Sequence, residues 1–310
     1  MKKFEGIWTA LVTPFNDRGQ IDWDAYAKSL KLQAEGGVNG VIPCGTTGES
    51  PTLSAEEKQK LITTTLEVLK GTPIQVAAGT GSNDTQETIE FSQWASKLSV
   101  GGQKLAGLLV VTPYYNKPSA AGLERHFTAV ADAVDCPIIL YNVPGRAGIS
   151  MTGETIAKLA RHPKIPALKE ATGNVSFTSE VIDHLGELAK NFSILSGDDV
   201  TFLPLLSVGA TGVISVASNL FPKEMVALYH AAQKHDYPRA AQIHQALYPV
   251  FRDFFVESNP VPVKFAMAKT GICGPYVRAP LAPLTSASEQ KVLAAVKKAQ
   301  AALAAAGGTK

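Results

Sequence analysis

Short apolar runs alternate with amphipathic stretches along most of the chain. The apolar runs recur at intervals of about 30 residues, the spacing of repeated βα units in a parallel sheet. We predict eight strands, at residues 6–13, 40–44, 74–78, 107–112, 138–142, 167–170, 193–196 and 212–216. The intervening stretches carry helix-start signals, since Ser54 and Asp84 are each followed three residues later by a glutamate.

Eight βα units are the number that closes a (β/α)8 barrel, whereas a doubly wound open sheet usually has five or six strands. After Phe221 the pattern changes, because strand-like runs are replaced by helix-period segments at residues 222–235, 238–257, 261–270 and 286–306. We therefore predict an α/β protein with a catalytic TIM barrel at residues 1–221 and a C-terminal helical region at residues 222–310. We expect the tail past Gly307 to be disordered.

Composition narrows the class of protein. The 310 residues are 45% hydrophobic and 18% charged, as in a globular protein with a large core. Lysine and arginine exceed aspartate and glutamate by only 29 to 27, which argues against nucleic acid as a partner. No apolar run is long enough to cross a membrane, and the run at residues 7–12 is too short for a signal peptide, so we expect a cytoplasmic protein.

Polar residues collect directly after the predicted strands, where TIM barrels carry their catalytic groups. Lys169 is the most conspicuous of them, because it interrupts an otherwise apolar strand. Burial favours the neutral amine, which is the form that attacks a carbonyl. Alternatively, Lys169 reaches solvent or pairs with Glu170, and the residue alone does not decide between these interpretations.

Three further strand ends carry groups that suit a small anionic substrate. The turn 45–48, Gly-Thr-Thr-Gly, is either an ordinary βα turn or a cradle whose N–H groups and hydroxyls bind a carboxylate. Tyr114, Tyr115 and Tyr141 are either core or rim aromatics, or phenols that transfer a proton. Arg146 is either a solvated surface residue or a bidentate carboxylate ligand.

Other polar residues fit structural roles better. The six histidines fall on predicted helices, away from the strand ends. Asp198 and Asp199 are not accompanied by further metal ligands at a suitable spacing, so we expect them to cap a helix at residues 200–208. The three cysteines are scattered, which favours neither a disulfide framework nor a metal site.

Seven segments, taken in order, identify the chain as similar to a known family. It resembles the dihydrodipicolinate synthases of the pyruvate-dependent class I aldolase superfamily, from Gly6 to about Ser286. The segments that carry the resemblance lie at residues 10–15 (ALVTPF), 45–50 (GTTGES), 113–118 (PYYNKP), 141–146 (YNVPGR), 169–173 (KEATG), 196–199 (SGDD) and 212–216 (GVISV).

The resemblance implies a role for each candidate residue. It makes Lys169 the residue that forms an imine with pyruvate, and it makes Thr46, Tyr141 and Tyr115 a proton relay in which a neighbouring subunit supplies Tyr115. Substrate-binding roles are implied for Thr47 and the turn 45–48 (pyruvate carboxylate), Arg146 (carboxylate of L-aspartate 4-semialdehyde), and Gly197 and Ile214 (pocket lining).

The implied reaction condenses pyruvate with L-aspartate 4-semialdehyde in the diaminopimelate route to lysine, without a metal or an organic cofactor. The implied assembly is a homotetramer built as a dimer of dimers. N-acetylneuraminate lyases and keto-deoxy-sugar-acid aldolases share the lysine and the tyrosine, and Arg146 favours aspartate semialdehyde over their aldehydes. A non-catalytic barrel that senses pyruvate or lysine is the alternative of another class, and the joint presence of the four catalytic-type residues argues against it.

Two features depart from the family pattern. Ser50, Asn83, Glu87 and Tyr114 match parts of a lysine-regulatory site found in some members, whereas Lys58 replaces a histidine of that site. A cation at Lys58 disfavours cationic lysine, so we expect weak or absent inhibition by L-lysine, which an initial-rate assay tests. The stretch at residues 98–104 is longer than the usual linker of the family, and the sequence assigns it no element.

Overall fold

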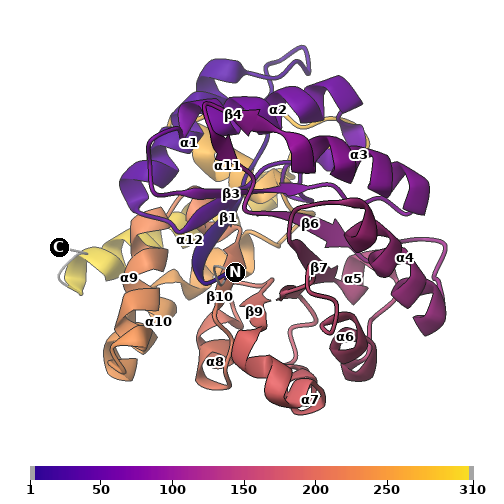
Figure 1. The fold of residues 1–310 in the computed structure, drawn as a ribbon. Coiled ribbons are helices and arrows are strands. Elements are labelled where there is room, and N and C mark those ends of the chain that lie inside the picture. The colour runs from indigo at the N-terminus through magenta and orange to yellow at the C-terminus, as the bar shows by residue number, and fades with distance from the viewer. Residues whose placement is uncertain (1–3, 307–310) are drawn as a thin grey trace. The chain divides into compact units, whose positions relative to one another are not determined.

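The structure is a computed structural model that describes residues 4–306; the predicted disordered tail therefore lies outside the described residues. Eight of the described strands close into a barrel in the order β1, β10, β9, β8, β7, β6, β3 and β2. Helices separate successive strands along the chain (Figure 1). The (β/α)8 prediction is confirmed. The barrel strands are β1 (Gly6–Ala10), β2 (Gly40–Ile42), β3 (Gln75–Gly79), β6 (Gly107–Val111), β7 (Ile138–Asn142), β8 (Ala167–Glu170), β9 (Ser193–Ser196) and β10 (Gly212–Ser215).

The predicted strands begin within one residue of the observed ones. β7, β8 and β9 match their predicted bounds at both ends, and every residue in these three strands is buried. Parallel strands covered on both faces read as near-continuous apolar runs, which is why the sequence located them so closely. The strands that the sequence extended too far, such as β1, continue into buried irregular chain rather than into solvent.

The chain divides into two compact units, of which the first holds the chain up to Gly6 and Gln75–Ile214. Its parallel strands pair in register, so that Val111 lies opposite Tyr141 and Tyr141 lies opposite Lys169. Side chains of Asp84, Ser119 and Asn174 cap three of its helices by accepting backbone N–H bonds. Its helices are α3 (Thr85–Lys97), α4 (Ala120–Ala133), α5 (Pro144–Ala147), α6 (Gly153–Leu159), α7 (Val175–Leu185), the 3-10 helix η2 (Gly186–Asn191) and α8 (Phe202–Ser207).

The stretch at residues 98–104 forms a small hairpin. Strands β4 (Ser99–Val100) and β5 (Gln103–Lys104) pair antiparallel across a two-residue loop. The loop residues Gly101 and Gly102 have φ angles of 56° and 85°. Two positive φ angles are what a type I′ turn requires, and this turn suits the twist of a hairpin.

One helix start was predicted wrongly. α8 begins at Phe202, its N-cap is Thr201, and no side chain bonds the cap position. The Asp198 carboxylate instead accepts a hydrogen bond from the Val200 N–H at 3.2 Å, and Ser196 Oγ donates to the Asp198 carbonyl at 2.7 Å. The aspartate therefore stabilises the turn before the helix rather than the helix itself.

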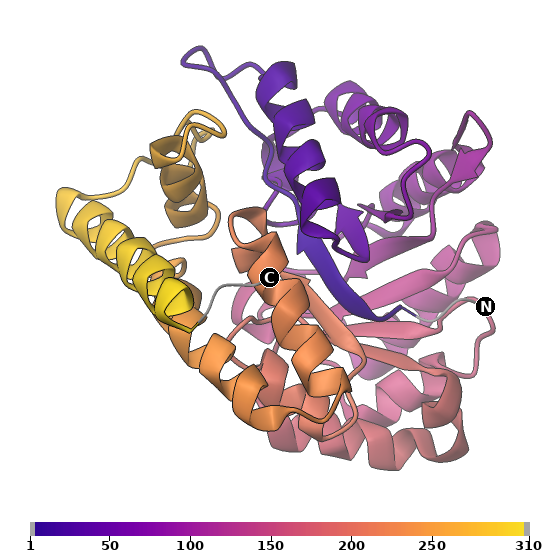
Figure 2. The ribbon, with the colours of Figure 1, turned by 90° about the vertical axis from the view of Figure 1, so that its left-hand side faces the viewer.

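The second unit consists of Ile7–Ile74 and Ser215–Lys310. Its C-terminal helices α10 (Tyr237–Asp253) and α12 (Ser286–Ala305) lie side by side (Figure 2). The four predicted C-terminal helices are confirmed, each beginning within one residue of its predicted start. The helices of this unit are α1 (Trp23–Gly36), the 3-10 helix η1 (Ser50–Thr52), α2 (Ala55–Val68), the 3-10 helix η3 (Ala217–Asn219), α9 (Pro222–Gln233), α10 (Tyr237–Asp253), α11 (Val261–Lys269) and α12 (Ser286–Ala305).

Helix α2 shows the capping box that its sequence predicts. Ser54 Oγ accepts the Glu57 N–H at 3.2 Å, and Glu57 Oε2 accepts the Ser54 N–H at 3.0 Å.

The predicted division of the chain into a barrel and a helical region at residue 221 stays a prediction. Of the helices in residues 4–306, none is both long and apolar enough to span a membrane.

Candidate active site

Lys169 and Tyr141 lie side by side on neighbouring strands. They are register partners on β8 and β7, and Lys169 Nζ is 4.1 Å from the centroid of the Tyr141 ring. Each residue is only 6% exposed. Lys169 is therefore a buried amine against an aromatic face, and the interpretation in which it reaches solvent does not fit the structure.

Glu170 is not the partner of Lys169. Successive strand residues point to opposite faces, so these two side chains diverge. Glu170 is fully buried, and its Oε1 accepts the Thr172 N–H at 2.6 Å. Burial raises the pKa of Glu170, and the charge of Asp198 adds to that effect. The described ion pairs do not include one between Lys169 and Glu170.

Gly197 and Ile214 lie next to each other at the ends of β9 and β10. Each follows directly on the register pair formed by Ser196 and Val213. A Cβ at Gly197 would lie 2.6 Å from the Cβ of Ala171, so a side chain does not fit there without displacing its neighbour. Ile214 is buried. The close approach of Ala171 explains why position 197 is a glycine. The role of Gly197 and Ile214 in lining a pocket through their backbone groups stays a prediction.

Arg146 and Tyr115 lie on two loops that touch. Arg146 is in the short helix α5 directly after β7, and its side chain is exposed. The Tyr115 N–H donates to the carbonyl of Ala147, the last residue of α5, at 3.4 Å. Tyr115 is 88% exposed and has a φ of 75°. Its role in a neighbouring subunit stays a prediction.

The second unit carries the turn at residues 45–48. The Gly48 N–H donates to the Gly45 carbonyl and the Glu49 N–H to the Thr46 carbonyl, both at 3.1 Å. Thr47 is buried, and its Oγ1 accepts a hydrogen bond from Asn259 Nδ2 at 3.0 Å. A Cβ at Gly45 would meet no atom within 4 Å, so the backbone there is open on that side. The turn is closed by its own hydrogen bonds, and Gly45 and Thr46 are partly exposed in it. Its role as an anion cradle stays a prediction.

The five residues assigned to regulation divide between the two units. In the first, Asn83 Nδ2 donates to the Tyr114 carbonyl at 3.2 Å, and Glu87 accepts from Ser82 Oγ at 2.7 Å. In the second, Ser50 begins η1 and Lys58 lies on α2, where its carbonyl accepts from the Cys44 thiol. Their regulatory role stays a prediction.

Sequence reasoning missed three residues that hold the turn at residues 45–49. Asn259, Lys264 and Arg278 all come from the C-terminal helical region and bond to the turn or to Glu49. Lys264 carried the same signal as Lys169, namely a lysine inside an apolar run, here on α11. Its partner Glu49 is 215 residues away in sequence, so spacing alone does not reveal the pair.

The described residues contain no cluster of three or more histidine, cysteine, aspartate or glutamate side chains arranged to hold a metal ion.

A family model, that of the dihydrodipicolinate synthetase family, matches residues 3–299. The chain belongs to the dihydrodipicolinate synthetase family. A 4-hydroxy-tetrahydrodipicolinate synthase from Leptospira biflexa is 46% identical over 295 residues, which cover 95% of this chain and 96% of that protein.

Two solved structures of this family resemble the chain closely. The 4-hydroxy-tetrahydrodipicolinate synthase of Methylacidiphilum fumariolicum matches with a TM-score of 0.93 and 43% identity, covering 98% of this chain and 99% of that one. The chloride-inhibited dihydrodipicolinate synthase of Acinetobacter baumannii, solved in complex with pyruvate, matches with a TM-score of 0.90 and 38% identity, covering 96% and 99%. The family that the sequence motifs indicated is therefore confirmed.

Proposed function

We propose that this chain is a 4-hydroxy-tetrahydrodipicolinate synthase that condenses pyruvate with L-aspartate 4-semialdehyde through an imine on Lys169. The observation that carries the proposal is the buried Lys169 amine against the Tyr141 ring, in a chain that belongs to the dihydrodipicolinate synthetase family. A lysine in such a setting is a suitable nucleophile for a ketone.

Each step conserves atoms and charge without an oxidant. The Lys169 amine adds to the pyruvate ketone, and loss of water gives an imine. The protonated imine withdraws electrons, so that a methyl proton leaves and an enamine forms. The enamine carbon then attacks the aldehyde of the second substrate. Finally, the amine of that substrate attacks the imine carbon, which closes a six-membered ring and releases Lys169.

The remaining residues are assigned by their chemistry and by the family. Tyr141, Thr46 and Tyr115 move protons between the substrate and solvent, with Tyr115 supplied by a second subunit of a homotetramer. Thr47 and the backbone at the start of the turn at residues 45–48 bind the pyruvate carboxylate, since the Gly48 N–H already donates to the Gly45 carbonyl. Gly197 and Ile214 line the pocket.

In this proposal Arg146 determines which aldehyde the enzyme accepts as its second substrate. Its exposed guanidinium, on the loop after β7, can bind the carboxylate of aspartate semialdehyde through two parallel hydrogen bonds. Sugar-derived aldehydes, the substrates of the alternative aldolases, lack a carboxylate for such a contact. The cytoplasmic location and the weak response to L-lysine stay predictions.

Turnover with competing aldehydes tests the proposal. The wild type should form a ring product from pyruvate and aspartate semialdehyde, and Arg146→Ala should lose about 2–4 kcal/mol of transition-state stabilisation for this aldehyde alone. Arg146→Lys is the matched control, which keeps the charge but loses the fork geometry, and should fall between the two. Efficient turnover of a sugar-derived aldehyde, with none of aspartate semialdehyde, would move the chain to the aldolases.

A further inference from the structure

The turn that carries Thr46 and Thr47 ends in a buried carboxylate. Glu49 is 3% exposed and has a φ of 57°. Cys44, directly before the turn, has a φ of 59°. A residue other than glycine is held in this left-handed region only where its surroundings fix it. Both ends of the turn are therefore positions that need an anchor.

Lys264 supplies one such anchor from helix α11. Its Nζ donates to Glu49 Oε1 at 2.7 Å and to the Thr13 carbonyl at 2.8 Å. The side chains of Lys264 and Glu49 are 0% and 1% exposed. Burial lowers the pKa of the Lys264 ammonium, and the Glu49 carboxylate opposes that shift. The ammonium also lies 4.2 Å from the centroid of the Phe15 ring.

Thr13 closes this contact into a ring of hydrogen bonds. Its Oγ1 donates to the Gly48 carbonyl at 2.7 Å, while its own carbonyl accepts from Lys264. The path runs from Lys264 to Glu49, back through the turn to Gly48, and by way of Thr13 to Lys264 again. The C-terminal half of the turn thus cannot shift without breaking one of these bonds.

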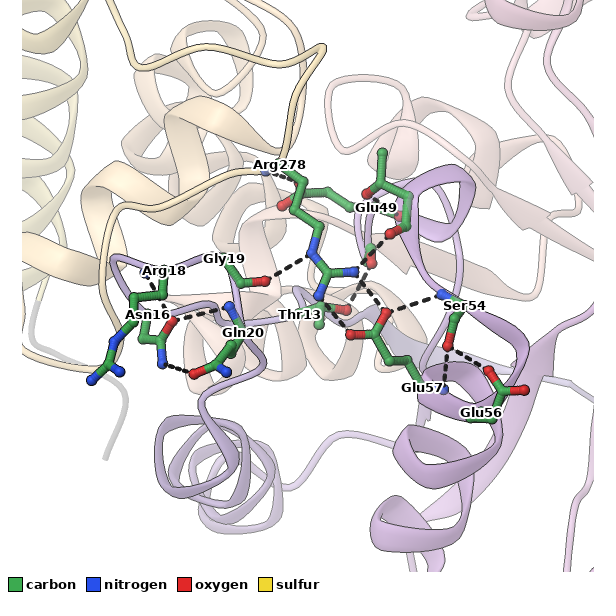
Figure 3. Close-up of polar contacts among 12 residues, drawn as sticks. Thr13, Asn16, Arg18, Gly19, Gln20, Glu49, Ser54, Glu56, Glu57 and Arg278 are labelled. Carbon is green, nitrogen blue, oxygen red and sulfur yellow. Dashed lines mark hydrogen bonds and ion pairs between the residues drawn. The ribbon is translucent and has the colours of Figure 1, made fainter.

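Arg278 fixes the other oxygen of the same carboxylate. Its backbone N–H donates to Glu49 Oε2 at 3.0 Å. Its guanidinium donates to the Thr52 carbonyl at 2.7 Å and to both oxygens of Glu57, at 2.7 and 2.6 Å (Figure 3). Arg278 therefore connects Glu49, through its backbone N–H, to the first turn of α2, through its guanidinium.

We propose that the buried Lys264–Glu49 pair is a positioning pair that holds the turn at residues 45–49 in the conformation that receives the pyruvate carboxylate. This inference rests on the role proposed above for Thr47 and the backbone of the turn. Buried ion pairs are weak stabilisers compared with apolar side chains of similar volume. In some proteins such pairs fix geometry, and small displacements of a binding group are costly for catalysis.

Residues of the C-terminal helical region hold the turn to which the proposed function assigns the pyruvate carboxylate. Asn259, just before α11, holds the Thr47 hydroxyl, while Lys264 and Arg278 hold Glu49. None of the three needs to touch the substrate. Their effect on binding passes through the conformation of the turn.

Charge-neutral variants separate positioning from stability. The single variants Lys264→Met and Glu49→Gln each leave a buried charge without its partner and should unfold at lower temperature. The double variant Glu49→Gln/Lys264→Met removes both charges with little change of volume, so it should melt close to the wild type. Lys28→Met is the matched control, because it removes another lysine bond to a carbonyl, that of Gly271 at 2.6 Å.

The readout is the pyruvate concentration that gives half-maximal borohydride-trapped adduct, together with the KM values for both substrates. The double variant should need about fivefold or more pyruvate, with an unchanged KM for aspartate semialdehyde, while Lys28→Met should match the wild type. A stable double variant with wild-type pyruvate saturation would overturn the proposal. If the double variant does not fold, Glu49→Asp, which retracts the carboxylate by one carbon, decides in the same way. Absence of any adduct in the wild type would instead refute the proposed function.

Discussion

His126 is a buried histidine whose ring has only part of its hydrogen bonding satisfied. It lies on α4, is 4% exposed, and its Nδ1 is 3.0 Å from Thr85 Oγ1. Its Nε2 is buried without a hydrogen-bond partner in the structure. Burial lowers the pKa of His126 to about 4, while the charge of Asp84 opposes the shift. The folded state therefore keeps this ring neutral at pH values where the unfolded chain is protonated.

His126 should make the folded protein sensitive to acid. The unfolded chain binds more protons between pH 6.5 and about 4, so the contribution to stability is complete above this window and is lost as the pH falls through it. Between pH 7.5 and 4.5 the wild type should lose about 2 kcal/mol more unfolding free energy than His126→Gln. Urea titration at the two pH values measures this difference, and equal losses would show that the ring is not held neutral.

Lys169 and Lys264 show that a residue pattern can reveal an unusual lysine without revealing its role. Both are buried lysines in apolar segments, so the sequence marks both as unusual. Only the structure shows that Lys264 has a carboxylate at 2.7 Å whereas Lys169 lies over the Tyr141 ring. Which buried lysine is an anchor and which a nucleophile depends on partners distant in sequence. The pattern singled out Lys169, and the family motifs decided its role.

At the level of elements, apolar periodicity located most helices and strands. It missed the start of α8 and the β4–β5 hairpin, because local hydrogen bonds and turn conformation determine both. Strands β7, β8 and β9 agree with their predicted bounds because each is buried throughout. The start of α8 was missed because Asp198 bonds to Val200 before the helix begins. The β4–β5 hairpin was missed because two residues per strand are too few to show alternation.

The effect of substitutions at Gly101 on stability should depend only on whether the new residue tolerates the backbone conformation of the hairpin turn. Gly101 is exposed and has a φ of 56°. Asparagine tolerates this conformation, whereas a β-branched residue does not. Gly101→Asn should leave stability within about 0.5 kcal/mol of the wild type, and Gly101→Val should lower it by about 1–2 kcal/mol. Urea titration of the matched pair checks the assignment, which equal stabilities of the two variants would disprove.

At the scale of the whole molecule, one chain does not supply a complete relay if Tyr115 acts in a neighbouring subunit. Its side chain is 88% exposed in the isolated chain. The sequence predicted the residue through its family motif, but no pattern within one chain can place a partner.

Subunit mixing tests the shared site. Tyr115→Phe and Lys169→Ala homo-oligomers should each lose activity, Tyr115→Phe by about 10²–10⁴-fold. When the two chains are co-expressed with different tags, a mixed dimer has one site with both Lys169 and Tyr115. Random pairing should restore about one quarter of the wild-type rate per subunit. Mixed oligomers with no gain over the parents would place Tyr115 outside the neighbouring site.

Lys169 should form an imine with pyruvate, which borohydride reduces to a stable adduct that the mass of the intact protein reveals. The wild type incubated with pyruvate should gain one reduced pyruvate adduct per chain, and Lys169→Ala should gain none. Proteolysis should place the adduct on the peptide that contains Lys169. An unmodified wild type, or an adduct of equal yield in Lys169→Ala, would contradict the account.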